Sequence, residues 1–307
     1  MSKLRGRSIL SVADLSVEEL ELILRVARTF KDMYYAGVRK LNILNGKSIA
    51  LIFQKPSTRT RVSMEVAVHE LGGYPIYLSW SELQLARGEP IKDTARVLSR
   101  YVSGIGARVY DHKHLEELAA YSSVPVINLL SNLEHPLQAI ADVFTIIEKK
   151  GSLNNLKIVF IGDGSSNVAH SLILAVTMLG GKIVVACPKQ YRPRNEIIQQ
   201  AQMYKGVVEI VEDPYEAVRG ADVVYTDVWV SMGEEAIAEI KRKVLRPYQV
   251  SEELMKYAKK DAIFMHCLPA VRGEEVTDEV IEGKWSVVWD QAENRLHTAK
   301  AVLALVV

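Results

Sequence analysis

Residues 48–61 read Ser-Ile-Ala-Leu-Ile-Phe-Gln-Lys-Pro-Ser-Thr-Arg-Thr-Arg. The apolar run Ser48–Phe53 predicts a buried strand, and Pro56 ends it. Ser57 has the side chain of a helix N-cap, and Thr60 follows at the third helical position. The sequence therefore predicts a strand, a turn and the N-terminus of a helix in direct succession.

This helix N-terminus is suited to binding phosphate or a similar small anion. Its first backbone N–H groups have no partner inside the helix, and the helix dipole is positive at this end. Three hydroxyls and one guanidinium group add donors, namely those of Ser57, Thr58, Thr60 and Arg59. Arg61 lies about 200° around the helix from Arg59, so we expect it to pair with Glu65 instead. The alternative is an ordinary capped helix with two solvated arginines.

Both halves of the chain alternate short apolar runs with helical patterns, which is typical of parallel sheets built from β-α units. At 307 residues, the chain exceeds the size at which one hydrophobic core usually stops growing. We therefore expect two parallel-sheet α/β domains. The expected domains are residues 1–150 and residues 151–290, with a C-terminal helix at residues 291–307 that packs back on the first.

The same patterns predict the individual elements. Strands are expected at residues 48–53, 74–78, 105–109, 124–129, 156–161, 182–186, 207–211, 222–226, 262–265 and 287–289. One helix is expected after the capping box Ser16-Val17-Glu18-Glu19, and others at residues 57–71, 91–102, 114–121, 136–149, 168–179, 213–219 and 291–305. Residues 79–90 form a long loop, either a lid or subunit contact or a plain surface excursion.

The composition argues against several classes of protein. A formal net charge of +1 does not supply the basic field that nucleic-acid or membrane-surface binding requires. No apolar run is long enough to span a bilayer, and no signal-peptide pattern follows the N-terminal residues. Cys187 and Cys267 are too few for a disulfide framework, which indicates a reducing compartment. We therefore expect a cytoplasmic enzyme that binds neither nucleic acid nor membrane.

Polar side chains follow several other expected strands. Arg108 would join the anion site if its strand neighbours residues 48–53, and would otherwise point into solvent. His135 and Gln138 begin a helix, where they either hold a carbonyl oxygen and an amide or serve only as capping side chains. In the second half, three reactive side chains come just past an expected strand: Asp227, Cys267 and Arg295.

The segment Gly162-Asp163-Gly164 follows a strand and opens a helix, as in a dinucleotide-binding unit. Asn167 replaces the third glycine of that motif, and Cys187-Pro188 stands where the ribose-binding acid is expected. A dinucleotide-dependent oxidoreductase is therefore a remote alternative, and it leaves residues 57–61 and 135–138 unexplained. A third possible function is that of a non-catalytic phosphate-binding or regulatory protein.

Four motifs together resemble the aspartate/ornithine carbamoyltransferase family, and within it the ornithine branch. They are Ser57-Thr58-Arg59-Thr60-Arg61, His135-Pro136-Leu137-Gln138, Asp227 with Ser231-Met232-Gly233, and His266-Cys267-Leu268-Pro269. The resemblance implies transfer of the carbamoyl group of carbamoyl phosphate to the side-chain amine of L-ornithine, giving L-citrulline and phosphate, in arginine biosynthesis or its catabolic reverse. It also implies a carbamoyl-phosphate domain followed by an ornithine domain, with the active site in the cleft between them. No metal or organic cofactor is implied, and the expected assembly is a homotrimer or an assembly of trimers.

The resemblance also implies roles for individual residues. Carbamoyl phosphate would be held by Ser57, Thr58, Arg59, Thr60, Arg108, His135, Gln138 and Arg295, by Gln84 from a neighbouring subunit, and by Cys267 and Leu268 at the reacting end. Ornithine would be held by Asn167, Asp227, Ser231 and Met232. The catalytic residues would be Arg108, His135, Asp227 and Cys267.

The implied reaction needs a neutral amine and donors for an oxyanion. An alkyl amine with a pKa of about 10.4 is mostly protonated at neutral pH, and Asp227 with Cys267 would help to deprotonate it. Thr58, Arg108 and His135 would stabilise the oxyanion. Asp227 argues against aspartate as the acceptor, whereas putrescine and N-acetylornithine remain alternatives to ornithine.

Overall fold

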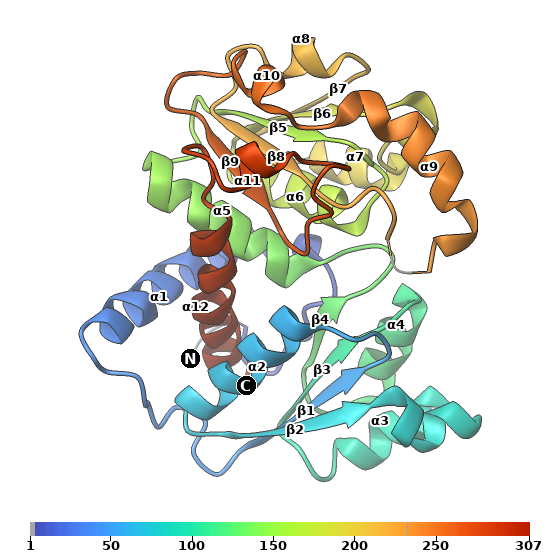
Figure 1. Ribbon diagram of the computed structural model, residues 1–307. Coiled ribbons are helices and arrows are strands. Elements are labelled where there is room, and N and C mark those ends of the chain that lie inside the picture. The colour runs from blue at the N-terminus through green and yellow to red at the C-terminus, as the bar shows by residue number, and fades with distance from the viewer. Residues whose placement is uncertain (1–3, 232) are drawn as a thin grey trace. The chain divides into compact units, whose positions relative to one another are not determined.

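The computed structural model describes residues 4–231 and 233–307 (Figure 1). The chain divides into two compact units: unit 1 is the chain up to Ile140 together with Asn294–Val307, and unit 2 is Ala141–Glu293. Both boundaries lie inside helices, α5 (Pro136–Lys150) and α12 (Val288–Val306). The expected domains kept residues 136–149 together in the first domain, whereas this division assigns residues 141–150 to unit 2.

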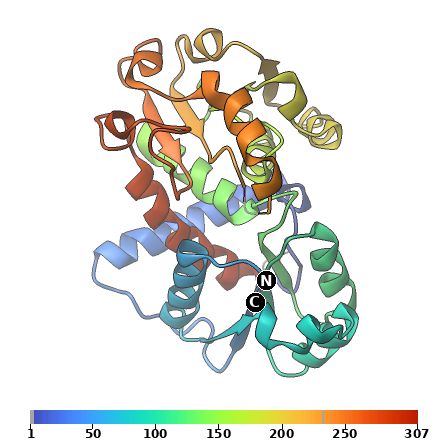
Figure 2. The ribbon, with the colours of Figure 1, turned by 45° about the vertical axis from the view of Figure 1, so that its right-hand side comes forward.

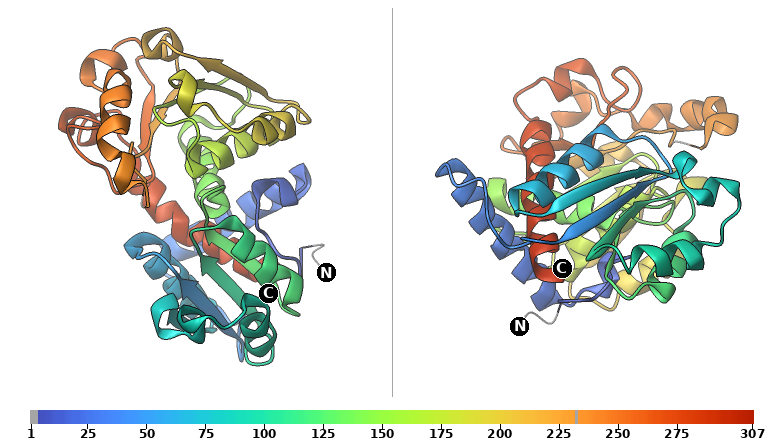
Figure 3. Two further views of the ribbon diagram at one scale, coloured as in Figure 1. Left: turned by 90° about the vertical axis from the view of Figure 1, so that its right-hand side faces the viewer. Right: turned by 90° about the horizontal axis from the view of Figure 1, so that it is seen from below.

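Unit 1 is built on a four-stranded parallel sheet with the order β2-β1-β3-β4. Its strands are β1 (Ser48–Phe53), β2 (Tyr74–Ser79), β3 (Gly104–Arg108) and β4 (Val126–Leu130). Figure 3 shows α3 (Ile91–Leu98) and α4 (His112–Tyr121) on one face and α2 (Thr58–Glu70) on the other. Ala50 and Ile52 point to the α3–α4 face, as strand alternation requires.

The first long helix, α1 (Val17–Tyr35), begins at the predicted capping box. Ser16 Oγ accepts from Glu19 N at 3.2 Å, and Glu19 Oε2 accepts from Ser16 N at 2.9 Å. Because both groups at the helix start are satisfied reciprocally, these two residues are enough to begin α1 at residue 17. This prediction is confirmed.

The part of α12 from Asn294 onward belongs to unit 1. It packs beside α1, where Lys31 Nζ donates to Asn294 Oδ1 at 2.9 Å. Lys300 Nζ donates to Glu70 Oε2 of α2 at 2.8 Å, and both side chains are buried. The described ends of the chain also meet here, because the backbone N–H near the start, at residue 6, donates to the carbonyl of residue 306 at 2.8 Å (Figure 2).

Unit 2 is built on a five-stranded parallel sheet with the order β7-β6-β5-β8-β9. Its strands are β5 (Lys157–Ile161), β6 (Lys182–Ala186), β7 (Val207–Val211), β8 (Val223–Thr226) and β9 (Ile263–His266). One face of the sheet packs on four helices: α8 (Pro214–Val218), α9 (Ala238–Leu245), α10 (Glu252–Met255) and α11 (Asp278–Ile281). Helices α6 (Asn167–Met178) and α7 (Asn195–Ala201) pack on each other, and both contact β7.

Short 3-10 helices connect several of these elements: η1 (Val12–Asp14), η2 (Trp80–Glu82), η3 (Gln84–Arg87), η4 (Lys189–Tyr191), η5 (Glu235–Ile237) and η6 (Arg246–Tyr248). The expected long loop at residues 79–90 thus contains two of them. Among residues 4–231 and 233–307, none of the helices combines the length and the apolar character that crossing a bilayer would need.

Each sheet has one place where the strand order reverses, between β1 and β3 in unit 1 and between β5 and β8 in unit 2. In open α/β sheets, ligands bind at such points, outside the carboxyl ends of the strands. In unit 1, Ser57 follows β1 and Arg108 is the last residue of β3. In unit 2, Asn167 follows β5 and Asp227 follows β8. The topology thus places four predicted site residues where each unit is expected to bind a ligand.

The strand expected at residues 287–289 is wrong. Helix α12 begins at Val288, and only one isolated bridge forms just before it, between Ser286 and Phe264. The backbone N–H of Val287 donates to the carbonyl of Phe264 at 3.0 Å, after which the chain turns into the helix. Arg295 therefore lies in the second turn of a helix, not just past a strand.

Candidate active site

Helix α2 begins with the N-cap that the sequence predicts. Ser57 is the N-cap, and its Oγ accepts from the backbone N–H of Thr60 at 3.2 Å. Thr60 is buried, Arg59 is half-buried and Thr58 is exposed. The strand, the turn and the helix start predicted from residues 48–61 are confirmed.

Arg61 has the structural role that its place on the helix predicted. Its Nε lies 3.1 Å from Oε1 of Glu65, and its guanidinium lies over the ring of Tyr77, 3.5 Å from the centroid. These contacts hold Arg61 against β2. The two arginines of this motif therefore have different environments, which offers a matched pair for mutagenesis.

Arg295 connects three elements of unit 1. Its Nη2 donates to Oγ1 of Thr60 at 3.2 Å, and its Nη1 donates to Oε1 of Gln138. All three side chains are buried, although they come from α12, α2 and α5. The hydrogen bonds therefore join the predicted anion site to the segment His135-Pro136-Leu137-Gln138.

Arg108 lies at the end of β3, directly beside the end of β1. Phe53 and Arg108 are partners in the parallel register, and Gln54 N donates to the carbonyl of Arg108 at 2.8 Å. The neighbourhood on which its predicted role depended is therefore present. Arg108 is also buried, which contradicts the alternative of a solvent-pointing arginine.

His135 is buried and directly precedes α5. Burial, and then the positive charges of Arg295 and Arg108, lower the pKa of His135 well below its ordinary value of 6.5. The imidazole is therefore neutral at neutral pH, and one ring nitrogen is able to donate to a carbonyl oxygen. The charges of both arginines therefore act on His135, which links these three predicted residues of unit 1 electrostatically.

Gln84 lies in η3, where its side chain is exposed. The family resemblance implies that Gln84 contacts a ligand bound to a neighbouring subunit, and this role stays a prediction.

In unit 2, Asp227 and Cys267 lie side by side at the ends of β8 and β9. Cys267 Sγ donates to Oδ1 of Asp227 at 3.0 Å, and Val228 N donates to the same oxygen at 2.8 Å. Burial raises the pKa of Asp227, whereas His266 and the hydrogen bond from Cys267 oppose that rise. A carboxylate with a raised pKa accepts a proton more readily, which suits a group that must take one from a substrate ammonium.

The loop that carries Cys267 is ordered by the buried pair of His266 and Glu275. Nδ1 of His266 accepts from Leu268 N at 2.8 Å, so Nε2 carries the proton and donates to Oε1 of Glu275 at 3.0 Å. The same carboxylate oxygen accepts from Val271 N at 2.7 Å. Leu268 has a φ of +59°, and its peptide bond to the following proline is cis. The sequence analysis did not identify Glu275.

A second buried network lies beneath the same strand ends. Gln291 Oε1 accepts from His266 N at 2.9 Å, and its Nε2 donates to Oδ1 of Asp142 at 2.7 Å. Tyr225 OH donates to Oδ2 of Asp142 at 3.0 Å. Burial, followed by the charge of Asp142, raises the pKa of Tyr225 well above 10.0. These groups fix the carboxyl ends of β8 and β9.

Two more predicted ornithine contacts lie on segments after β5 and β8. Asn167 is the first residue of α6 and is half-buried, and its neighbour Ser166 caps the helix by accepting from Ala169 N at 3.2 Å. Ser231 is also half-buried. Met232 lies outside the described residues.

Asp227, His266 and Cys267 also bring one carboxylate oxygen, one ring nitrogen and one sulfur within 4.8 Å of one another. Such a donor set is compatible with zinc. Asp227 and Cys267 are hydrogen-bonded to each other, and His266 to Glu275.

Sequence comparisons cover both units. The carbamoyl-P binding domain of aspartate/ornithine carbamoyltransferase matches residues 7–148, and the Asp/Orn binding domain of that family matches residues 154–306. The chain belongs to the aspartate/ornithine carbamoyltransferase family. The family resemblance of the four sequence motifs is therefore confirmed.

Similar members of this family include proteins that are named ornithine carbamoyltransferase. Ornithine carbamoyltransferase of Hyperthermus butylicus is 64% identical, over 99% of this chain and 98% of the relative. The anabolic ornithine carbamoyltransferase of Pyrococcus furiosus is 57% identical, over 99% of this chain and 97% of the relative.

Solved structures of the family share the fold. Ornithine carbamoyltransferase from Pyrococcus furiosus superposes with a TM-score of 0.95 at 57% identity, covering 100% of this chain and 98% of that one. The enzyme from Thermus thermophilus gives 0.88 at 41% identity, with 97% of each chain covered. The expected carbamoyltransferase-type α/β fold is confirmed.

Proposed function

We propose that this protein transfers the carbamoyl group of carbamoyl phosphate to the side-chain amine of L-ornithine, releasing L-citrulline and phosphate. The observation that carries the proposal is the hydrogen-bonded pair of Asp227 and Cys267, a buried carboxylate and a half-buried thiol, which is suited to binding an amine. Eight similar relatives, 55–64% identical over nearly the whole chain, are named ornithine carbamoyltransferases. The oxidoreductase alternative has no such support.

Carbamoyl phosphate is the ligand proposed for unit 1. The phosphate group is held at the α2 N-terminus by backbone N–H groups, by the side chains of Ser57, Thr58 and Thr60, and by Arg59. The carbamoyl end is held by Arg108, His135, Gln138 and Arg295, with Cys267 and Leu268 at the reacting end. The neutral His135 supports this role, because it donates to the carbonyl oxygen without adding a third positive charge to the two arginines.

L-Ornithine is the ligand proposed for unit 2. Asn167, Ser231 and Met232 hold its amino-acid end, while Asp227 and Cys267 orient the side-chain amine. After the side-chain ammonium gives one proton to Asp227, its nitrogen forms a bond to the carbamoyl carbon, and an oxyanion develops. The bond from that carbon to the phosphate oxygen then breaks, and phosphate leaves with the electron pair and takes the second proton from the nitrogen. Arg108 and His135 stabilise the oxyanion.

The candidate acceptors differ in the charged groups that they would bring to unit 2. A dicarboxylate such as aspartate would bring negative charge toward Asp227, whose charged form burial already disfavours. Putrescine and N-acetylornithine present a suitable amine, but putrescine lacks the carboxylate of the ornithine amino-acid end and N-acetylornithine lacks the charged α-ammonium group. The test is release of phosphate and of the carbamoylated acceptor, which is citrulline when the acceptor is ornithine, with ornithine, putrescine, N-acetylornithine or aspartate supplied separately. Turnover with ornithine alone supports the proposal, and turnover with another acceptor overturns the assignment of unit 2.

We further propose a cytoplasmic homotrimer, or an assembly of trimers, that works in arginine biosynthesis. The exposed position of Gln84 supports a contact across subunits, and one relative is named as anabolic. Size-exclusion chromatography with light scattering tests the assembly, since a monomer with full activity would contradict a shared site.

A further inference from the structure

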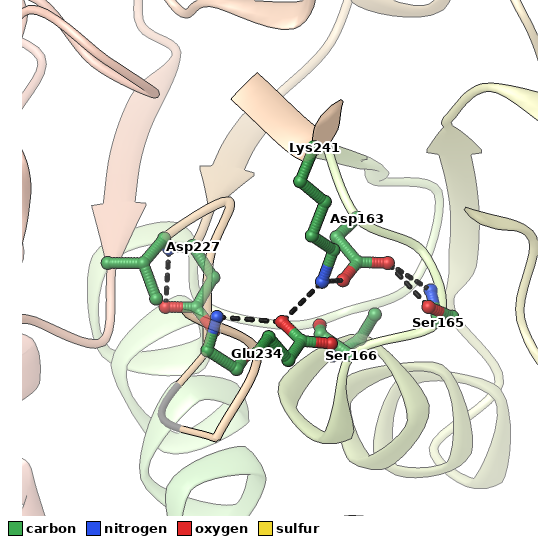
Figure 4. A network of polar contacts seen from close by, with 9 residues as sticks. Asp163, Ser165, Ser166, Asp227, Glu234 and Lys241 are labelled. Carbon is green, nitrogen blue, oxygen red and sulfur yellow. Dashed lines mark hydrogen bonds and ion pairs between the residues drawn. The ribbon is translucent and has the colours of Figure 1, made fainter. Parts of the chain in front are cut away.

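Lys241 is a buried lysine of α9 that the proposed function does not use. Its side chain is 1% exposed, and its Nζ donates to Oδ2 of Asp163 at 2.6 Å and to Oε2 of Glu234 at 2.5 Å (Figure 4). The ring of Tyr191 lies 5.3 Å from the same nitrogen. The ammonium group thus joins two carboxylates that are 71 residues apart in the chain.

Asp163 organises the turn that leads into α6. Its Oδ1 accepts from Ser165 N at 2.9 Å and from Ser165 Oγ at 2.6 Å, and its carbonyl accepts from Ser166 N at 3.2 Å. Ser166 then caps the helix whose first residue is Asn167. The position of Asn167 therefore depends on a turn that Asp163 holds.

Glu234 organises the segment after β8 in the same way. The oxygen that accepts from Lys241 also accepts from Ser231 N at 2.8 Å, and Glu234 N donates to the carbonyl of Ser231 at 3.1 Å. One carboxylate oxygen thus contacts both the buried lysine and the backbone of Ser231. The position of Ser231 therefore depends on Glu234.

The charges explain why a lysine is needed at this point. Asp163 is buried and the side chain of Glu234 is 33% exposed, so two carboxylates face each other with little water to separate them. One ammonium group between them leaves a net charge of −1 in place of −2. Desolvation lowers the pKa of Lys241, but its two partners outweigh that cost and raise the pKa overall. Without the lysine, the carboxylates would repel each other and move apart.

We infer that Lys241 is a positioning residue for ornithine binding, because it holds the segment of Ser231 against the turn that sets Asn167. This inference rests on the proposed function, in which those two residues bind the amino-acid end of ornithine. Lys241 itself does not contact the substrate. It acts by holding the segment of Ser231 and the turn before Asn167 in fixed positions relative to each other.

The first test is Lys241→Met, with Lys243→Met as the matched control on the exposed side of the same helix. The expected result is an ornithine KM raised about tenfold or more, since about 1.4 kcal/mol of lost coupling corresponds to a factor of ten. The KM for carbamoyl phosphate should stay within about twofold, because its proposed site lies in unit 1. Equal effects on both substrates, or an unchanged ornithine KM, would overturn the inference.

A double-mutant comparison separates positioning from general stability. Glu234→Gln keeps the shape of the side chain and removes its charge, and its partly exposed position makes folding of the variant secure. If Lys241 and Glu234 act through one link, the double variant Lys241→Met/Glu234→Gln has the same ornithine KM as the more affected single variant. Additive effects of the two changes would contradict that link.

Hydrogen exchange at the backbone N–H of Ser231 tests the same bridge without any turnover. Exchange is expected to be faster in Lys241→Met and in Glu234→Gln, and unchanged in Lys243→Met. If the wild-type protein does not use ornithine, the proposed function fails, while this measurement still reports on the bridge. Unchanged exchange in both variants would overturn the positioning role whatever the substrate.

Discussion

The thiol of Cys267 donates to the carboxylate of Asp227 across 3.0 Å, at the ends of two neighbouring strands of unit 2. The pairing partly offsets the rise in the pKa of Asp227 that burial causes. In the proposed reaction, the substrate amine displaces the thiol, which is a weak donor, and becomes a stronger, cationic donor to the carboxylate.

Replacing Asp227 by Asn should abolish most turnover with ornithine. The change keeps the size of the side chain but removes the proton acceptor, and we expect kcat to fall by about 100-fold or more. Steady-state kinetics measures this, with Cys267→Ser as the comparison, because serine retains a hydrogen-bond donor to Asp227. A kcat for Asp227→Asn within a few-fold of the wild type would contradict the proposed role.

The pKa of Asp227 also predicts a stability effect. Because its folded-state pKa is raised, the folded protein binds more protons than the unfolded chain between the two pKa values, so this group reduces stability as pH rises through that window. Asp227→Asn should therefore be more stable than the wild type at pH 7, and the difference should shrink toward pH 4. Urea unfolding at both pH values measures this. A constant difference would show that the carboxylate does not titrate as expected.

His135 predicts the opposite dependence on pH. Its folded-state pKa is lowered, so the unfolded chain binds the extra proton first, and stability is lost as pH falls below about 6.5 toward the folded-state value. His135→Gln should remove that part of the acid sensitivity and lower kcat by about 100-fold through loss of an oxyanion donor. Thermal unfolding between pH 7 and pH 5 measures the first effect, and a wild-type slope in the variant would contradict it.

Arg59 and Arg61 provide a matched test of the anion site. Arg59→Ala should raise the KM for carbamoyl phosphate by about tenfold or more, because it removes a charged hydrogen-bond donor to the phosphate. Arg61→Ala removes the contacts with Glu65 and Tyr77 and should change stability by only about 1 kcal/mol, with little effect on KM. Similar KM changes in the two variants would contradict the assignment of the ligand to one side of α2.

Tyr225→Phe should destabilise unit 2. Loss of the phenol leaves Oδ2 of the buried Asp142 without this donor, which should lower the free energy of unfolding by about 1–3 kcal/mol. Tyr74→Phe serves as the control, because that side chain is 68% exposed. Chemical denaturation measures both, and equal stability of the two variants would show that the Asp142 network is not important for folding.

The elements of the fold were largely predictable because local patterns determine them. The capping box at Ser16, the N-cap at Ser57 and the pair of Arg61 and Glu65 each depend on residues a few positions apart, and each is confirmed. The strand expected at residues 287–289 is wrong because three apolar residues also suit the first turn of a buried helix. Short apolar runs do not distinguish these two cases.

The supporting groups of the candidate site were not predictable in the same way. Lys241, Arg242 and Lys243 are consecutive cations, and only tertiary packing determines that the first of them is buried. Glu275 and Gln291 likewise form hydrogen bonds with His266, from which they are 9 and 25 residues away in the sequence. Sequence motifs identified residues proposed to touch substrate, whereas the network that holds them required the three-dimensional arrangement.

Helix α12 contains the boundary between the two units, and this has a consequence for the order in which they fold during synthesis. Unit 2 is one continuous segment, Ala141–Glu293, whereas unit 1 needs Asn294–Val307 to supply Arg295 and Lys300. Since a ribosome releases the chain from its N-terminus onward, the second unit is complete before the first. The strands of unit 1 must therefore wait, with their apolar faces only partly covered, until the residues that follow unit 2 emerge.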